Sequence, residues 1–319
     1  MGLKPIMPFG VSNRHNCKKS YFSCLHGFTL VELLVVISVI AMLLAIMLPA
    51  MNKARDTGKK IVCMSNQKQL IVGWINYSVQ NDGKLVPGYT TRCIWGSVKT
   101  PPYEIKWDIT SWHPEKSWVA VPRFEGTDSD GEPKFGNWAY RPGYQDRFII
   151  AGLLFPYVQQ TDVYRCPSSI VTGNPQTQNN FCSYAVSSIM NGYCQGKDPV
   201  PAGSEYGVRR KYIVTKMADI RTPGERLAMI CQGGVAARNN RVECFSVNIG
   251  TTAWSDIPPT VHMGRTGTSM SYADGHTAYN KWNNSKKYSA PTFSPREAVT
   301  VEERKTDFAF LRYACWGIK

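Results

Sequence analysis

The most informative stretch of the chain is Gly27-Phe28-Thr29-Leu30-Val31-Glu32-Leu33-Leu34-Val35-Val36-Ile37. It opens a run that stays apolar from Leu33 to Leu48 except for Ser38. As a helix rising about 1.5 Å per residue, residues 28–48 would be roughly 31 Å long, which matches the hydrocarbon core of one bilayer. The sequence therefore predicts one transmembrane helix over 28–48.

The segment before this helix is basic. Residues 1–27 hold four basic residues and no acidic one: Lys4, Arg14, Lys18 and Lys19. A secretory signal peptide fits poorly, because its apolar region is shorter and ends in a small-residue cleavage site, which Pro49-Ala50-Met51 does not provide. An ordinary signal anchor fits the length, but it does not explain Glu32.

Glu32 is an ionisable residue inside the membrane end of the predicted helix. A charge at the bilayer centre costs roughly 2.5–3.5 kcal/mol, and less near an interface, so such residues usually have a partner. Cleavage between Gly27 and Phe28 would create a new α-amino group. Phe28 and Glu32 are four residues apart and share a helix face. In an assembly, the amino group of one subunit would neutralise Glu32 of its neighbour.

These residues resemble the type IV prepilin signature, which is shared by pilins and type II secretion pseudopilins. The resemblance implies that prepilin peptidase cuts after Gly27 and N-methylates Phe28, and that Glu32 aligns subunits during assembly. Pro49 falls where many members of the family have a helix-kinking proline. The resemblance further implies a single-pass inner-membrane protein, with a cytoplasmic leader and an extracytoplasmic head, that enters a filament.

The charges that flank the helix disagree with that orientation. The positive-inside rule counts Lys and Arg near both membrane ends. The leader side offers three such residues close to the helix, whereas the far side offers five: Lys53, Arg55, Lys59, Lys60 and Lys68. Taken alone, this distribution favours a cytoplasmic head. We follow the resemblance, and the conflict calls for a topology test.

Three further motifs resemble a large-headed pseudopilin-like subfamily. The first is C-x-x-N-x-x-Q-L at residues 63–70, the second is Cys-Pro-Ser at 166–168 followed by Ser-Tyr-Ala at 183–185, and the third is His262 followed by Asp274-Gly275. The expected fold is α+β, in which a long N-terminal helix packs on a head with an antiparallel sheet. The expected domains are a leader at 1–27, a transmembrane helix at 28–48, its amphipathic continuation at 49–84 and a head at 85–319.

Within the head, local patterns predict individual elements. Apolar, β-prone runs predict strands at 226–231 and 242–247. Asp274-Gly275 predicts a hairpin over 268–279 with a type I′ turn, and the aromatic tail at 308–318 is interpreted as a last strand. Residues 147–158 have the pattern of a short amphipathic helix.

Residues 88–146 form a Trp-rich insertion. It contains five of the nine tryptophans: Trp95, Trp107, Trp112, Trp118 and Trp138. These rings either fill a loop-rich core or form a ligand-binding face. Asp128, Asp130 and Glu132 resemble the beginning of a calcium-binding loop. The match does not extend further, because Ala139 stands where an EF-hand has its twelfth-position Glu. Calcium is therefore a weak possibility.

No other cofactor or metal is expected. Eight cysteines follow the leader, and an even number permits disulfides in 105 pairings among which the sequence does not choose. No C-x2-C pair exists, which disfavours zinc. His262, Asp274 and His276 are better explained by a structural turn, in which Asp274 caps backbone amides and Gly275 adopts a positive φ.

The sequence holds no catalytic constellation, so we expect no enzyme. It lacks G-x-S-x-G, H-E-x-x-H and a Walker motif. The formal net charge is +14, which becomes +10 when the four basic residues of 1–27 are removed. In the absence of a nucleic-acid-binding motif, this charge is interpreted as a solvated basic surface, with no nucleic-acid partner.

Two functions remain open. The first is a subunit of a type II secretion pseudopilus or a type IV pilus-like filament, and the second is a membrane-anchored or filament-displayed protein that binds glycans or other ligands through its aromatic-rich head. The resemblance implies four partners: prepilin peptidase, other pilin or pseudopilin subunits, the inner-membrane assembly platform and the lipid bilayer. A bulky head would crowd a helical lattice, which favours a tip or minor subunit.

Overall fold

The computed structural model describes residues 29–88, 92–95, 105–107, 116–122, 145–169, 182–191, 212–233, 244–247, 254–290 and 297–318. The chain divides into two compact units, Met1–Ala50 and Met51–Lys319. The predicted cleavage site at Gly27 and Phe28 lies outside the described residues. The weak calcium candidates Asp128, Asp130 and Glu132 also lie outside them.

Helix α1 runs from Leu30 to Gln80 and is 51 residues long, with Pro49 inside it. Its beginning, through Ala50, belongs to the first unit, and the rest belongs to the second. Within the described part of the chain it is the one helix long and apolar enough to cross a membrane, judged by length and composition. The prediction of a long, initially apolar N-terminal helix is confirmed.

The second unit contains a four-stranded antiparallel sheet in the order β4-β5-β6-β7. The strands are β4 Tyr184–Val186, β5 Leu227–Cys231, β6 Gly267–Tyr272 and β7 Thr277–Lys281. This sheet and α1 together confirm the expected α+β fold. Strands β5 and β6 are buried along their whole length.

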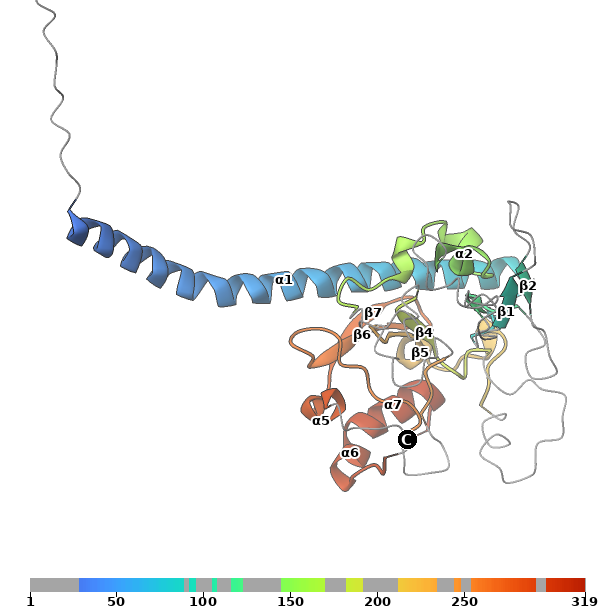
Figure 1. The fold of residues 1–319 in the computed structure, drawn as a ribbon. Coiled ribbons are helices and arrows are strands. Elements are labelled where there is room, and N and C mark those ends of the chain that lie inside the picture. The colour runs from blue at the N-terminus through green and yellow to red at the C-terminus, as the bar shows by residue number, and fades with distance from the viewer. Residues whose placement is uncertain are drawn as a thin grey trace, which may run out of the picture. The chain divides into compact units, whose positions relative to one another are not determined.

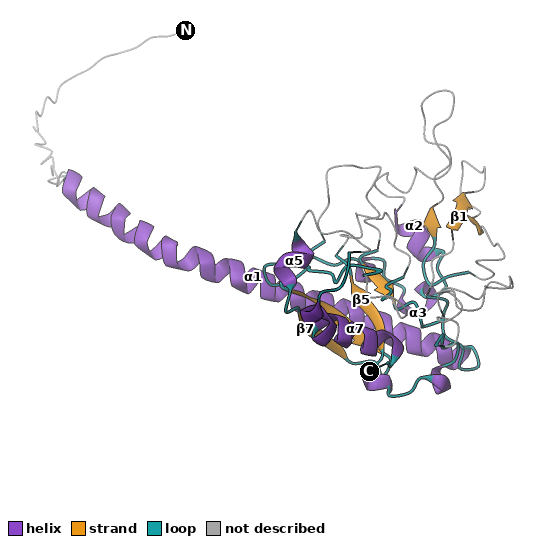
Figure 2. Cartoon of the chain, turned by 90° about the horizontal axis from the view of Figure 1, so that it is seen from below, coloured by secondary structure: helices purple, strands orange, loops and turns teal. Residues whose placement is uncertain are grey.

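Helices cover both faces of this sheet within the second unit, which explains why β5 and β6 are buried throughout. The later part of α1 lies along one face (Figure 1), where Gln67 Nε2 donates to the carbonyl of Ser269 over 3.0 Å. Helices α6 Val301–Lys305 and α7 Asp307–Trp316 cover the other face, and both views agree on this arrangement (Figures 1 and 2). On that side Arg226 Nη1 donates to the carbonyl of Tyr313 over 2.6 Å.

The tail predicted as a last strand forms helix α7 instead, so that prediction was wrong. Phe308, Leu311 and Cys315 are buried. Their spacing of three and then four residues is that of one helix face. Gly317, at a φ of +70°, ends the helix in the left-handed conformation that favours glycine. Aromatic content alone had suggested a strand, whereas the period of the buried residues is helical.

Two other local predictions were wrong in part. Residues 147–158 form two helices, α2 Gln145–Ile150 and α3 Phe155–Val158, rather than one. Between them, Gly152 lies so close to the backbone of Trp118 that a side chain at this position would collide with it. Of the strand expected at 242–247, residues 244–247 are described, and there Phe245 forms an isolated bridge with Ser187.

The hairpin between β6 and β7 is confirmed, but its turn is not type I′. That turn needs a positive φ at both central residues. Here the amide of Gly275 donates to the carbonyl of Tyr272 over 2.8 Å. Within this turn only Gly275 has a positive φ, at +92°. The bond closes a turn over 272–275 in which glycine occupies the left-handed position after the two central residues.

The described part of the Trp-rich insertion contains short strands. They are β1 Arg92–Trp95, β2 Ile105–Trp107 and β3 Val121–Pro122, in the order β2-β1-β3, with β1 and β3 parallel. Trp118 is fully buried and stacks on Tyr164 with ring centroids 6.2 Å apart, so it packs in the core. Trp112 and Trp138 lie outside the described residues.

The remaining short elements border these layers. They are α5 Ser285–Ser289 and the 3-10 turns η2 Asp162–Tyr164, η4 Met217–Asp219 and η5 Pro223–Glu225.

Candidate functional site

The first turn of α1 is capped by Thr29 and Glu32. Glu32 Oε2 accepts hydrogen bonds from the amide and the hydroxyl of Thr29, each 2.8 Å long, and Thr29 Oγ1 accepts from the amide of Glu32 over 3.3 Å. This reciprocal arrangement is a capping box, which satisfies two of the free amides at a helix start. Glu32 therefore has a local partner within a single chain.

The surface of α1 after this cap is almost wholly apolar. From Leu30 to Leu48 the large apolar side chains are exposed, from 47% for Val36 to 78% for Leu30. The hydroxyl of Ser38 donates to the carbonyl of Val35 over 2.7 Å, so it is satisfied inside the helix. Such a surface is unfavourable in water and requires lipid or other apolar helices around it.

An exposed apolar helix that begins at a capped carboxylate and continues into an α+β head is consistent with a membrane-anchored, pilin-like class of protein. Residues 25–48 match the family model described as the prokaryotic N-terminal methylation motif. The motif and the helix that follows it support assignment of the chain to the type IV pilin-like family. Comparisons with curated proteins and with solved structures find no match.

The matched motif indicates how the protein is processed, assembled and anchored. It indicates a chain of the kind that prepilin peptidase processes and that assembles with other pilin subunits. It also supports anchoring in a membrane through the apolar helix. Proteins with this motif are typically structural subunits of the pilin type. Gly27, Phe28 and Glu32 all lie within the matched range.

The structure places Asp274 and Gly275 in the turn between β6 and β7. Asp274 Oδ1 accepts from the amide of His276 over 3.0 Å and pairs with His276 Nδ1 at 2.6 Å. Partial burial opposes ionisation of Asp274, but the bonds from His276 outweigh it, so the pKa of this carboxyl lies below its usual value. Gly275 accepts a 2.7 Å bond from Lys68 Nζ, which joins the turn to α1.

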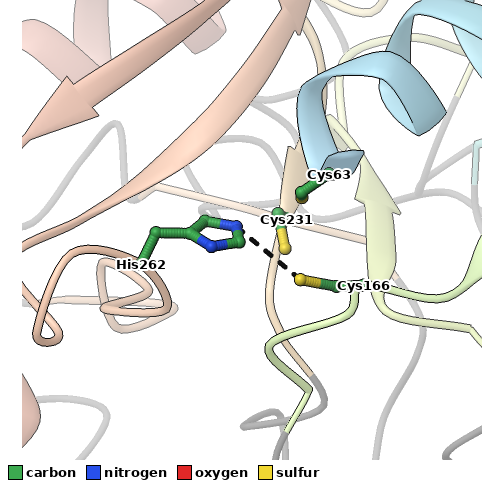
Figure 3. A group of neighbouring side chains, drawn as sticks. All are labelled: Cys63, Cys166, Cys231 and His262. Carbon is green, nitrogen blue, oxygen red and sulfur yellow. Dashed lines mark hydrogen bonds between the residues drawn. The ribbon is translucent and has the colours of Figure 1, made fainter. Parts of the chain in front are cut away.

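A second group of chemically active side chains lies between α1 and the sheet. Cys63 of α1, Cys166, Cys231 at the end of β5 and His262 converge so that their ligand atoms all lie within 4.8 Å of one another (Figure 3). All four residues are buried, and none is more than 4% exposed. His262 thus lies with three cysteines, whereas Asp274 and His276 pair with each other.

The three thiols of this group form no disulfide. Burial opposes ionisation of Cys63, but hydrogen bonds from Cys166, Cys231 and His262 outweigh it and hold the pKa of Cys63 well below its usual value. Burial raises the pKa of Cys231, and its hydrogen bonds to the other two thiols raise that pKa further.

The sequence did not predict this cluster, because metal sites are predicted from closely spaced ligand pairs such as C-x2-C. The four residues come from separate segments, so no local spacing reveals them. One indication was nevertheless available, because Cys63, Cys166 and His262 each belong to a motif that the sequence singles out. The expectation of no metal remains untested by the structure.

Proposed function

We propose that the protein is a pilin-like subunit that prepilin peptidase cuts between Gly27 and Phe28, and that then joins a type II secretion pseudopilus or a type IV pilus-like filament. The observation that carries this proposal is the methylation motif at 25–48, of which residues 30–48 form the exposed apolar start of α1. Before assembly, this surface would hold the subunit in the bilayer. In the filament, neighbouring helices would cover it.

Glu32 would set the axial register in that filament. Both bonds from Thr29 go to Glu32 Oε2. Among the described residues, no bond to Oε1 is found. The carboxylate could therefore keep its capping role and also accept the Phe28 α-amino group of a neighbouring subunit. The Coulomb attraction between these two opposite charges is stronger in apolar surroundings than in water. The ion pair would therefore favour the register that brings the two charges together.

The orientation that goes with this function has the N-terminus in the cytoplasm and the head outside the inner membrane. The assembly platform of that membrane would then be the partner that extracts the subunit. Because the flanking charges favour the reverse orientation, a cysteine-labelling or protease-protection experiment on intact cells is needed. Labelling of the head from outside the inner membrane would support the proposal.

A ligand-binding function of the head is less well supported. Trp118, one of the five tryptophans of the insertion, is buried and stacked in the core, so it offers no surface to a glycan. We therefore retain assembly as the proposed function, with a tip or minor subunit favoured by the size of the head.

Mass spectrometry of the N-terminus of the native protein tests this function directly. We expect a chain that begins at N-methylated Phe28. A native chain that retains residues 1–27 would contradict the proposal, because neither the new amino group nor the bridge to Glu32 could then form.

A further inference from the structure

We propose that Cys63, Cys166, Cys231 and His262 bind a structural Zn2+ ion in a closed four-ligand site (Figure 3). This proposal goes beyond the assembly function and does not rest on it, because all four residues lie in the second unit of the chain. Three thiolates and one imidazole form a ligand set typical of structural zinc sites.

The spacing of the ligand atoms fits a tetrahedral ion. Cys166 Sγ and His262 Nε2 lie 3.6 Å apart. In a tetrahedral zinc site with Zn–S of about 2.3 Å and Zn–N of about 2.0–2.1 Å, a sulfur and a nitrogen are separated by about 3.6 Å. All four ligand atoms lie within 4.8 Å of one another, so a single ion between them needs only small adjustments of the side chains.

A disulfide accounts for the cluster less well. Three cysteines can form only one disulfide among themselves, which would leave a buried thiol and a buried imidazole without a role. A zinc ion uses all four groups. Binding would displace the thiol protons, which pass to solvent, so that three thiolates share the charge of one divalent cation.

Neighbouring groups donate hydrogen bonds to two of the sulfurs. The amide of Ser168 donates to Cys166 Sγ over 3.4 Å, and the hydroxyl of Tyr184 donates to Cys63 Sγ over 3.4 Å. The hydroxyl of Ser269 lies 2.9 Å from Cys63 Sγ. Donors of this kind stabilise a thiolate and orient it, as outer-shell groups do around metal ligands.

Side-chain amides of α1 bind the segment that carries Cys166 and the neighbouring strand β6. Asn66 Nδ2 donates over 2.9 Å to the carbonyl of Arg165, the residue before Cys166. Gln67 Nε2 donates over 3.0 Å to the carbonyl of Ser269 in β6. Because residues 63, 66 and 67 share a face of α1, one helix surface supplies a ligand and two positioning residues.

The chemistry of the site also limits which ion it takes and what the ion does. Thiolate and imidazole ligands suit zinc, whereas magnesium and calcium prefer oxygen. Four protein ligands leave no open position for water or substrate, so the ion would be structural rather than catalytic. It would fasten α1 to the sheet, to the turn that carries Cys166 and to the segment that carries His262.

Metal analysis of the full-length protein in detergent tests the proposal. We expect one zinc ion per chain when the protein is purified without chelators. Cys166→Ser, Cys231→Ser and His262→Ala should lose most of this zinc. Cys182→Ser and Cys315→Ser are matched controls, because both remove a buried free thiol outside the cluster and should retain the ion.

A second measurement uses the wild-type chain, so it holds even if the variants do not fold. The protein is stripped with a chelator under reducing conditions and then supplied with Co2+. We expect the intense absorption of thiolate-bound, tetrahedral cobalt, and X-ray absorption on the zinc form should show three sulfur ligands and one nitrogen ligand. A reduced wild-type protein that binds neither ion overturns the proposal, as does a native protein that lacks zinc and has a disulfide within the cluster.

Discussion

The carboxylate of Glu32 accepts two hydrogen bonds of 2.8 Å from Thr29, one from its amide and one from its hydroxyl. Glu32 therefore has two separable properties, namely a hydrogen-bond acceptor that caps α1 and a negative charge at the membrane end of the helix. Filament register would depend on the charge, whereas the helix start would depend on the acceptor. Substitutions that remove one property without the other can distinguish them.

Glu32→Gln keeps an acceptor for Thr29 and removes the charge, whereas Glu32→Ala removes both. If an ion pair sets the register, both variants should be cleaved normally and incorporated into filaments about tenfold less, which corresponds to about 1.4 kcal/mol. Immunoblots of sheared filaments and of membranes measure the incorporated fraction.

Thr29→Ala is the control for capping, since it removes the hydroxyl cap and leaves the charge; loss of such a cap costs about 1 kcal/mol of helix stability. Wild-type filament levels in Glu32→Gln, together with a defect in Thr29→Ala, would show that capping rather than charge is the function of Glu32.

Gly27→Glu should block removal of residues 1–27, because the resemblance places this glycine directly before the cut. The expected result is a chain that stays at its full mass and remains in the membrane. Gly58→Ala is a suitable control, because a Cβ at that exposed helical position meets nothing within 4 Å. A normally shortened Gly27→Glu product, detected by gel or mass spectrometry, would show that cleavage does not require this residue.

Gly275→Ala should destabilise the second unit. The φ of Gly275 is +92°, and an added Cβ would lie 3.1 Å from Ile75 Cδ1 of α1. Strain of this kind costs about 1–3 kcal/mol, which thermal or denaturant unfolding of the full-length protein would detect. Gly264→Ala separates the two causes, since its φ is +69° but nothing lies within 4 Å. If Gly275→Ala and Gly264→Ala lost the same amount of stability, the contact of the added Cβ with α1 would contribute nothing to the destabilisation.

Glu303 is expected to stabilise the C-terminal helices in a pH-dependent manner. Burial opposes its ionisation, but hydrogen bonds from Thr300 and Lys287 outweigh it and lower its pKa. When the pKa of a carboxyl is lower in the folded state, its ionised form stabilises the fold at every pH above the pKa of the unfolded state. This stability is lost as the pH falls through the pKa of the folded state.

Glu303→Gln keeps an acceptor for Thr300 but removes the charge. It should therefore reduce stability at neutral pH by about 1 kcal/mol, the usual scale of one hydrogen bond. The difference from wild type should shrink as the pH falls below the ordinary range of a Glu carboxyl. Unfolding midpoints measured from neutral to acid pH check this prediction. A difference that grows on acidification would contradict the assigned role of the charge.

Local patterns in the sequence were reliable where one segment determines its own structure. The apolar run after Glu32 indicated a helix whatever the rest of the chain does, and the structure contains α1. Asp274-Gly275 indicated a hairpin in the same way, because the turn needs a residue that tolerates a positive φ. The predicted type I′ turn was wrong, since the turn type depends on the register that β6 adopts with β7.

Patterns failed where packing partners decide the outcome. The aromatic tail at 308–318 was compatible with a strand or a helix, and it became α7 because a helix can bury Phe308, Leu311 and Cys315 on one face. For Trp118 the structure bears out core packing, one of the two alternatives that the sequence left open, but its stacking partner Tyr164 is distant in the chain and could not be predicted.

The sequence by itself thus determined the apolar N-terminal helix, the methylation motif and the broad α+β class, because each depends on residues that are neighbours along the chain. Only the tertiary structure decided that Cys63, Cys166, Cys231 and His262 meet. Their approach depends on how α1 lies against the sheet and on the loops that carry the other ligands, and these arrangements arise from packing between distant segments.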